Sequence, residues 1–293
     1  MRIILWDYLK DAEEIMTKGA LATRSDKIGP EIDISEKQIS KMMKITKLMK
    51  LSSVLDFGYY IVSIEGVSRS FTHQWVRYRI AAHMQQSLRY VKIDTSTTNW
   101  FVIPPEITKK GAETIIKYIK SNLNSGRVYL ELISRGVPPE DARFALPIGV
   151  KTHISSAFDP EELIHIIYQR TCFDAQWEIR AVAYALLFAG LIVHPNIFDG
   201  VGPPCIYIGE EKCRGSGGGK CMNEAKSIVD KIRSLARQLR QQYLELKQND
   251  KFTVDLTDIL GYRAPKQLEE EISRVIGSKV DLSHDVILEI YKR

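Results

Sequence analysis

The sequence predicts an α+β fold with a helical appendage at its C-terminal end. Residues 59–64 are β-branched and aromatic and lie between two glycines, which is typical of a strand. Several longer segments repeat apolar residues every three or four positions, which is typical of amphipathic helices. A heavily charged amphipathic stretch at 223–248 follows a glycine-rich segment and indicates that the last part of the chain is helical.

In the first half of the chain, the apolar periodicity predicts a helix over 33–56, followed by the strand over 59–64. Ser68 is a suitable N-cap for a second helix that we expect to reach Ile80. Val76, Ile80 and Met84 would then share one face of that helix. Residues 87–93 alternate polar and apolar side chains and favour an extended or loop segment.

The middle of the chain predicts a helical region over 105–133, ended by Gly136 and two prolines, and a short helix over 139–146. A strand over 148–156 precedes Asp159, which caps a helix that starts at Pro160. The most apolar helix is expected over 175–191. It is too short to span a bilayer, and no longer uncharged apolar run exists.

Beyond this helix, glycines and prolines make 200–219 irregular, 223–248 is helical, and 257–292 is expected to hold one or two short helices. We therefore divide the chain into a core over 1–205, a Gly/Cys-rich linker over 206–222 and a helical appendage over 223–293.

Composition excludes several protein classes. The 293 residues are 44% hydrophobic and 26% charged, which rules out collagenous, disordered and disulfide-scaffold chains. The formal net charge of +5 is spread along the chain, so it favours small anionic ligands and not nucleic acid. No secretion signal and no membrane segment is apparent, and we expect a cytoplasmic protein without a membrane partner.

The four cysteines lie within 50 residues of one another, and three of them are spaced by eight positions. Three alternatives stay open: a structural zinc site, disulfides, and free thiols. A spacing of seven intervening residues is longer than in usual zinc motifs, so the sequence assigns no metal with certainty. The candidate ligands are Cys172, Cys205, Cys213 and Cys221.

The segment 72–93 contains the side chains that are best suited to bind an anionic ligand. It contains three arginines, several amides and a serine, and no carboxylate. Guanidinium groups offer planar, permanently charged donors to a phosphate, although a solvated basic face is the simpler alternative. Arg77 and Arg79 are two positions apart on the expected helix, so they would point in different directions and serve two ligands or two subunits.

These residues resemble the flavin-dependent thymidylate synthase family. Arg77-Tyr78-Arg79, seven residues and Ser87 are similar to its Arg-His-Arg, seven residues, Ser motif. Further similar segments occur in the expected order from about residue 50 to 205, and several ordered motifs are stronger evidence than one. They include 53–56, 65–70, His73-Gln74, 136–138, Ala142-Arg143, Leu146-Pro147, Arg170 and 175–180.

The resemblance implies the family's mixed or antiparallel sheet flanked by helices and the reductive methylation of dUMP to dTMP. It further implies that methylenetetrahydrofolate supplies the carbon and that FAD reduced by NADPH supplies the hydride. The family's homotetramer shares active sites among subunits, which would let divergent arginines each reach a ligand.

The family's site residues carry over by position. Ser87 and Arg170 match catalytic positions, and His165 and Asp159 lie on the expected flavin side. For His165, a place on a helix face with a satisfied hydrogen bond is the simpler alternative. For Arg143 and Arg170, pairing with Asp141 or Glu178 is the alternative to a ligand-binding role. The matched nucleotide-binding positions are Gln74, Arg77, Gln85, Ser87, Arg89, Arg143 and Arg170. The matched flavin-binding positions are Ser53, Asp56, Arg77, Tyr78, Arg79 and Ile80.

Some residues depart from the family pattern. Tyr78, Leu51 and Phe57 stand where the family has histidines, and Met84 stands where a polar residue is common. Glu161 adds a second carboxylate next to Asp159, and carboxylates repel a pyrophosphate. Three hypotheses follow: a working synthase, an enzyme with altered flavin or folate chemistry on the same fold, and a relative that binds nucleotide without catalysis.

Overall fold

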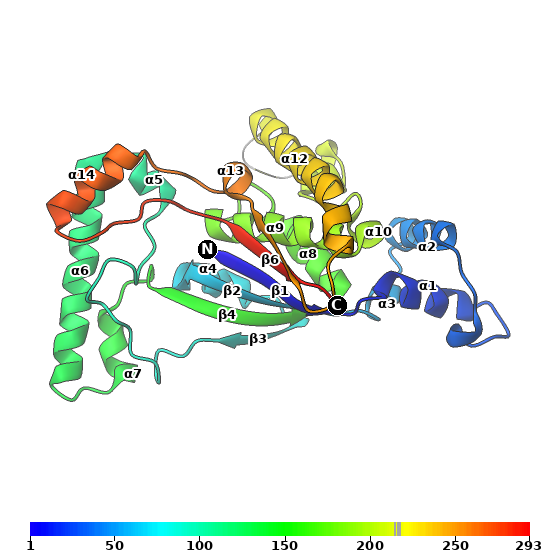
Figure 1. The fold of residues 1–293 in the computed structure, drawn as a ribbon, viewed down its shortest axis with the longest axis horizontal. Coiled ribbons are helices and arrows are strands. Elements are labelled where there is room, and N and C mark those ends of the chain that lie inside the picture. The colour runs from blue at the N-terminus through cyan, green and yellow to red at the C-terminus, as the bar shows by residue number, and fades with distance from the viewer. Residues whose placement is uncertain (214, 216–217) are drawn as a thin grey trace.

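One mixed sheet forms the centre of the molecule. The computed structural model describes residues 1–213, 215 and 218–293. The sheet has the strand order β3, β4, β2, β1, β6, β5 (Figure 1). β1 and β6 are parallel, and the other neighbouring pairs are antiparallel, so the expected mixed sheet is confirmed. The strands are β1 (Arg2–Tyr8), β2 (Tyr60–Ser68), β3 (Ala81–Gln85), β4 (Lys151–Phe158), β5 (Lys251–Asp255) and β6 (Ile287–Tyr291).

Helices cover one face of this sheet (Figure 1). Tyr60, Val62 and Ile64 of β2 are buried, whereas the residues between them are only half-buried. The covering helices are α4 (Arg69–Trp75), α8 (Pro160–Arg170) and α9 (Trp177–Val193). α9 is apolar on all sides because α12 (Gly218–Leu244) packs on its outer side, so it has no face in water.

The C-terminal segment belongs to the same sheet. β6 pairs with β1, for example Leu288 with Ile3, and β5 pairs with β6. The expected short helices are α13 (Thr257–Leu260) and α14 (Lys266–Ile276), and α14 packs beside α6 (Ala112–Ser134) at one end of the molecule (Figure 1). Neither strand was predicted from the sequence. The division at residues 205 and 222 stays a prediction.

The N-terminal helices lie at the opposite end of the molecule from α6 (Figure 1). β1 and α1 (Ala12–Ala22) were not predicted, and the single helix expected over 33–56 is wrong. It is split into α2 (Glu36–Met49) and α3 (Ser52–Leu55) because Lys50 takes a left-handed conformation, with a φ of 52°, and ends the first helix.

A similar break divides the helical region expected over 105–133. α5 (Pro105–Thr108) is followed by Gly111, whose φ of 88° suits glycine, and then by α6. The short helix over 139–146 is confirmed as α7 (Pro139–Ala142) and a 3₁₀ turn at Arg143–Ala145. The strand expected over 148–156 is confirmed as β4, which starts three residues later and ends two residues later. The remaining helices are α10 (Pro195–Phe198), α11 (Pro204–Tyr207) and 3₁₀ turns at Gly29–Glu31 and Glu210–Lys212.

None of the helices in the described part of the chain has both the length and the apolar composition needed to cross a bilayer.

Candidate functional site

The arginine-rich segment begins with a short helix and not with the longer one expected. The Ser68 side chain accepts a hydrogen bond from the Phe71 amide, so the predicted N-cap is confirmed. Phe71 and Trp75 stack with their ring centres 5.3 Å apart and are fully buried. α4 ends at Trp75, and Ala81 already begins a strand. The predicted helical face of Val76, Ile80 and Met84 is therefore wrong: Met84 lies in β3, and all three are exposed.

Tyr78 is the centre of the first group of site residues. It lies in the irregular segment between α4 and β3, and its side chain is only 7% exposed. Its Oη accepts a hydrogen bond from Arg170 Nε at 2.5 Å and donates to Gln169 Oε1 at 3.2 Å. The ring meets His165 edge-on, with centroids 6.0 Å apart. Tyr78 thus joins the motif segment to the C-terminal half of α8.

The electrostatics of this contact keep Tyr78 a neutral phenol. Burial raises the pKa of Tyr78, and the nearby Arg170 charge lowers it only in part. The Arg170 guanidinium lies 5.3 Å from the Tyr78 ring centre. A neutral Tyr78 hydroxyl can donate to Gln169 and accept from Arg170 at the same time, so it holds both side chains in place.

The two arginines of the motif are exposed beside Tyr78. Arg77 Nε donates to the backbone carbonyl of His73 at 3.1 Å, and Gln74 is half-buried in α4. Since Arg77 and Arg79 lie outside a helix, the expectation that helical geometry separates them is wrong. Both guanidinium groups face water.

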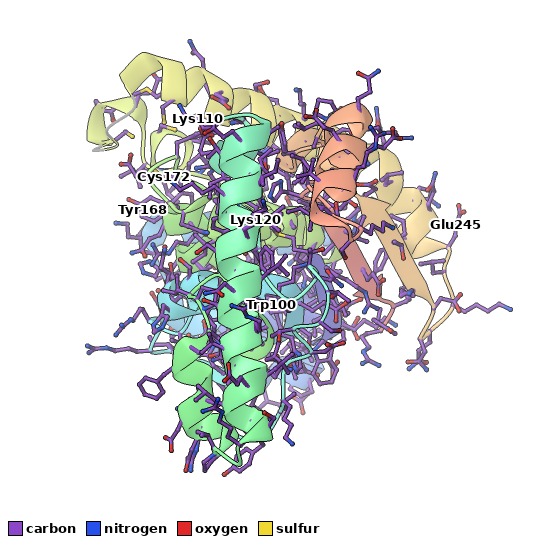
Figure 2. All side chains as sticks on the ribbon, turned by 90° about the vertical axis from the view of Figure 1, so that its left-hand side faces the viewer. Trp100, Lys110, Lys120, Tyr168, Cys172 and Glu245 are labelled. Carbon is purple, nitrogen blue, oxygen red and sulfur yellow. The ribbon has the colours of Figure 1, made fainter. Side chains whose placement is uncertain are left out.

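Two cavities adjoin α8. The larger has a volume of 840 Å³ and the smaller 360 Å³, and Tyr168 and Ile208 line both. Figure 2 shows Tyr168 and Cys172 on the same side of the molecule. The larger cavity is also lined by Gln169, Arg170, Cys172, Asp174, Ala175, Pro204, Glu211 and Gly215. The smaller is also lined by Thr46, Lys47, Lys50, Leu51, Ser52, Leu55, Glu161, Ile164, His165 and Tyr207.

The smaller cavity adjoins the residues expected to bind flavin. Ser52 Oγ donates to Glu161 Oε1 at 2.5 Å, and the neighbouring Ser53 is exposed. Burial, followed by the charges of Asp159 and Glu161, raises the pKa of Asp56. The three carboxylates therefore lie close enough together to disfavour one another's charge.

Asp159 has a structural task as well. Its side chain accepts a hydrogen bond from the Glu162 amide at 2.7 Å at the start of α8. The predicted cap at Asp159, with Pro160 in the first turn, is confirmed.

A second group of site residues surrounds the opposite end of β3. Gln85 Nε2 donates to Thr72 Oγ1 at 2.8 Å, and Ser87 Oγ accepts from the Arg89 amide at 3.2 Å. Arg89 Nε donates to Glu140 Oε2 at 2.9 Å, and Arg143 Nε donates to the Glu140 carbonyl at the same distance. The alternative partner Asp141 is not the acceptor for Arg143. This end of β3 therefore brings Ser87, Arg89 and Arg143 into one neighbourhood.

Arg69 belongs to this second group and was missed. Its guanidinium donates to the Gln86 carbonyl at 2.6 Å, its Nε is buried without a partner, and burial and then the Arg143 charge lower its pKa. An unpaired buried donor next to a second positive charge is suited to an anion. The sequence feature that could have identified Arg69 is its position directly after the Ser68 cap.

The two groups do not meet within one chain. Tyr78 and Arg170 lie at the start of β3, and Ser87, Arg89 and Arg143 lie beyond its end. The five residues of β3 span about 13 Å at roughly 3.3 Å per residue. The structure thus separates the predicted nucleotide-binding residues into two clusters. The alternative in which Arg170 pairs with Glu178 is wrong, because Glu178 accepts hydrogen bonds from Ser68 and Gln176.

The cysteines gather near the larger cavity as free thiols, without disulfides. A Cβ placed on Gly215 would lie 3.5 Å from Cys213 Sγ and 3.6 Å from Cys172 Sγ. Burial, followed by the neighbouring thiols, raises the pKa values of Cys205 and Cys221. Within the described residues, no three His, Cys, Asp or Glu side chains form a group that would hold a metal ion. A zinc site at the four cysteines stays a prediction.

Comparison with known proteins gives consistent results. A family described as "Thymidylate synthase complementing protein" matches residues 4–196. The flavin-dependent thymidylate synthase of Sulfolobus acidocaldarius is 38% identical over 209 residues, covering 70% of this chain and 78% of that protein. The protein of the same name from Pyrococcus furiosus is 37% identical over 215 residues, covering 71% and 88%.

A solved structure shares the fold. It is a UMP/dUMP methylase from Streptomyces cacaoi bound with 5-Br dUMP, and it aligns with a TM-score of 0.61 at 14% identity, covering 67% of this chain and 92% of that one.

Proposed function

Because the chain belongs to the flavin-dependent thymidylate synthase family, we propose that it catalyses the reductive methylation of dUMP to dTMP with a flavin. The observation that supports this proposal most directly is the contact between Tyr78 and Arg170. It joins the family's motif segment to α8 at the wall of the 840 Å³ cavity. In this proposal methylenetetrahydrofolate supplies the carbon, and NADPH reduces the flavin.

The smaller cavity is suited to part of the flavin. Lys47, Lys50 and His165 line it, and the exposed Arg77 and Arg79 lie on the adjoining segment. Cationic donors of this kind suit a pyrophosphate. A bound, reduced flavin would supply the hydride. Lys50, Arg77 and Arg79 would hold its phosphates, and His165 and Tyr78 would position it.

The nucleotide would be held by residues from both clusters. Arg89 and Arg143 would bind the phosphate, and Ser87 and Gln85 would orient the uracil through hydrogen bonds. Arg170 would face the same nucleotide, positioned by Tyr78. As one chain keeps the clusters apart, we propose that a neighbouring subunit completes each site, within a homotetramer.

The edge of the sheet supports this assembly. β3 is the terminal strand, so one side of it has no strand partner within the described chain. Met84 on this strand is 80% exposed, and nearby Tyr90 is 79% exposed. An exposed edge with large apolar side chains is a surface that proteins usually cover.

One observation favours an alternative function. The carboxylates of Asp56, Asp159 and Glu161 lie close together beside the smaller cavity. Their negative charge disfavours a pyrophosphate there. A relative that binds dUMP through the arginine clusters and has altered or lost flavin chemistry would have this arrangement.

Titration of the purified protein with FAD, with and without dUMP, distinguishes the proposed function from the alternative. We expect saturable binding in visible absorbance and flavin fluorescence, perturbed by dUMP, followed by dTMP formation when methylenetetrahydrofolate and NADPH are added. The Tyr78→Phe variant should weaken the dUMP effect because Arg170 loses its acceptor. If dUMP binds and FAD does not, the alternative replaces the proposed function. Metal content of the same preparation tests the zinc prediction.

A further inference from the structure

A separate cavity lies between the core and the C-terminal segment. Its volume is 280 Å³, which is near the lower limit for a small-molecule site. One wall is α9 with the turn before it, and the other walls come from α5, α12, α13 and the segment that leads into β6. It shares no lining residue with the two cavities beside α8.

Two buried polar atoms of the lining residues have no hydrogen-bond partner. They are Tyr184 Oη and His284 Nδ1. Tyr184 is 1% exposed and His284 is 7% exposed, so water outside the protein does not readily satisfy either group. A buried polar atom without a partner is costly, and few occur in folded proteins. Both residues line the same cavity, so a ligand seated there, with a small shift of either side chain, would supply the missing partners.

The hydrogen bonding of His284 defines what it needs. His284 Nε2 bonds to the Ile103 carbonyl, which can only accept, so Nε2 carries the proton. Burial lowers the pKa of His284, so the ring is neutral at pH 7. Nδ1 is therefore an acceptor that lacks a donor, whereas the Tyr184 hydroxyl can donate or accept.

The shape of the lining favours a flat ring. Trp177 and His284 meet edge-on with centroids 4.8 Å apart, and Tyr262 and His284 have centroids 5.8 Å apart. Phe173 also lines the cavity, and the Arg180 guanidinium lies 4.5 Å from its ring centre. Aromatic walls of this kind are suited to a planar aromatic ligand.

The charges of the lining cancel. Arg180 and Lys109 are cationic, whereas Glu106 and Glu224 are anionic, and Lys109 and Glu106 are paired at 2.7 Å. A site for a phosphate or another anion would have an excess of positive charge. We propose that this cavity binds a neutral, planar nitrogen heterocycle that presents an N–H donor to His284, the chemistry of a nucleobase.

The cavity also adjoins the turn that lines the 840 Å³ cavity. Arg180 donates to the carbonyls of Phe173 and Ala175, at 3.1 and 3.0 Å. Phe173 lines this cavity, whereas Cys172 and Ala175 line the 840 Å³ cavity. A bound heterocycle therefore contacts, from its other side, the turn that lines the 840 Å³ cavity.

Calorimetric titration tests the proposal. The protein is first saturated with FAD and dUMP, so that the proposed active site is filled, and benzimidazole is the probe. We expect saturable binding of one benzimidazole per chain. The matched probe 1-methylbenzimidazole lacks the N–H donor and leaves His284 Nδ1 unpaired, so it should bind about tenfold more weakly or worse.

Variants place the binding in this cavity. Tyr184→Phe removes one hydroxyl and should weaken benzimidazole binding by about threefold to tenfold. Ile228→Phe adds volume at the lining and should abolish it. The control Tyr129→Phe removes a buried hydroxyl on α6, away from this cavity, and should leave binding unchanged. The melting temperature confirms that each variant is folded.

Three results would overturn the proposal: no binding at millimolar benzimidazole, equal affinity for both probes, or unchanged affinity in folded Tyr184→Phe and Ile228→Phe. This test does not depend on turnover. Failure of dTMP synthesis with retained benzimidazole binding would contradict the proposed function alone.

Discussion

At the residue scale, Tyr78 takes a position where the family usually has histidine. A phenol hydroxyl both donates and accepts, and here it does so between Gln169 and Arg170. Tyr78 is buried and both hydrogen bonds are partly shielded from water, so they are stronger than an exposed pair would be. The substitution therefore preserves a polar connection to α8 while changing the chemistry that the side chain offers to a flavin.

Arg89→Ala should remove nucleotide affinity and leave the fold unchanged. The Arg89 pair with Glu140 is exposed on both sides, and such pairs contribute at most about 1 kcal/mol. We expect a large loss of dUMP affinity by calorimetry and a small shift in melting temperature. The control is Arg135→Ala, an exposed arginine paired with Glu131 on α6, which should keep dUMP affinity. Retained affinity in Arg89→Ala would contradict its assignment to the phosphate.

The burial of neutral His194 predicts that the free energy of unfolding decreases in mild acid. It is buried and neutral: Nε2 donates to the Lys10 carbonyl and Nδ1 accepts from Tyr60 Oη at 2.8 Å. Burial lowers the pKa of His194, so the unfolded chain binds this proton more tightly. The contribution is fully present above the unfolded pKa of about 6.5 and is lost as pH falls toward the lowered folded pKa, by up to about 1.4 kcal/mol per pH unit.

Urea unfolding at about pH 7.5 and about pH 5.5 measures this effect. The His194→Gln variant keeps a donor and an acceptor and has no charge to gain, so its free energy of unfolding should depend less on pH. His83 and His284 have pKa values lowered by burial as well, and they supply the slope that the variant retains. Equal slopes for the two proteins would show that His194 is not buried in its neutral form.

At the element scale, α4 and α9 are joined by one buried carboxylate. Glu178 on α9 accepts from the Ser68 amide at 2.8 Å, from the Ser68 hydroxyl, and from Gln176 Nε2 at 2.8 Å. Ser68 in turn caps α4. The start of the arginine-rich segment is therefore fixed to the most buried helix of the protein.

Glu178→Ala should destabilise the protein by roughly 3–5 kcal/mol, because it leaves several buried donors without an acceptor. Urea unfolding gives the change in free energy. Glu131→Ala removes an exposed glutamate from α6 and should cost less than about 1 kcal/mol. If both variants lost a similar small amount, α4 would not depend on Glu178.

Sequence periodicity located most of these elements but not their ends. The apolar pattern that continues past Trp75 predicts a longer helix, yet 81–85 pair with β4 and form a strand. Tertiary hydrogen bonding overrides the local pattern there, because the same residues can complete a sheet edge. The breaks at Lys50 and Gly111 depend on single backbone conformations that periodicity does not report.

At the scale of the whole molecule, the C-terminal segment completes the central sheet. β6 pairs with β1, and Leu256, Val286, Leu288 and Ile290 are fully buried in the main core. Each such side chain contributes about 1.5–3 kcal/mol, which together is comparable with the about 5–15 kcal/mol that stabilises a typical domain. The main core therefore includes side chains from both ends of the chain.

A chain that lacks residues 249–293 should lose cooperative folding. The truncation would expose the β1 edge and the buried apolar residues that face β6. Circular dichroism during heating, with the full chain as reference, measures the result. A truncated chain that melts cooperatively and binds FAD would instead show that the core folds without β5 and β6.

The sequence by itself determined the family, the cap at Ser68, the cap at Asp159 and, except for Arg69, the arginines of both clusters, because these depend on residue type and local spacing. The tertiary structure decided the rest. The pairing of β1 with β6 and the cavity between α9 and the C-terminal segment join residues far apart in the chain, and the strand β3 separates the arginines into two clusters. Local periodicity has no information on such contacts, because they form only when distant segments pack together.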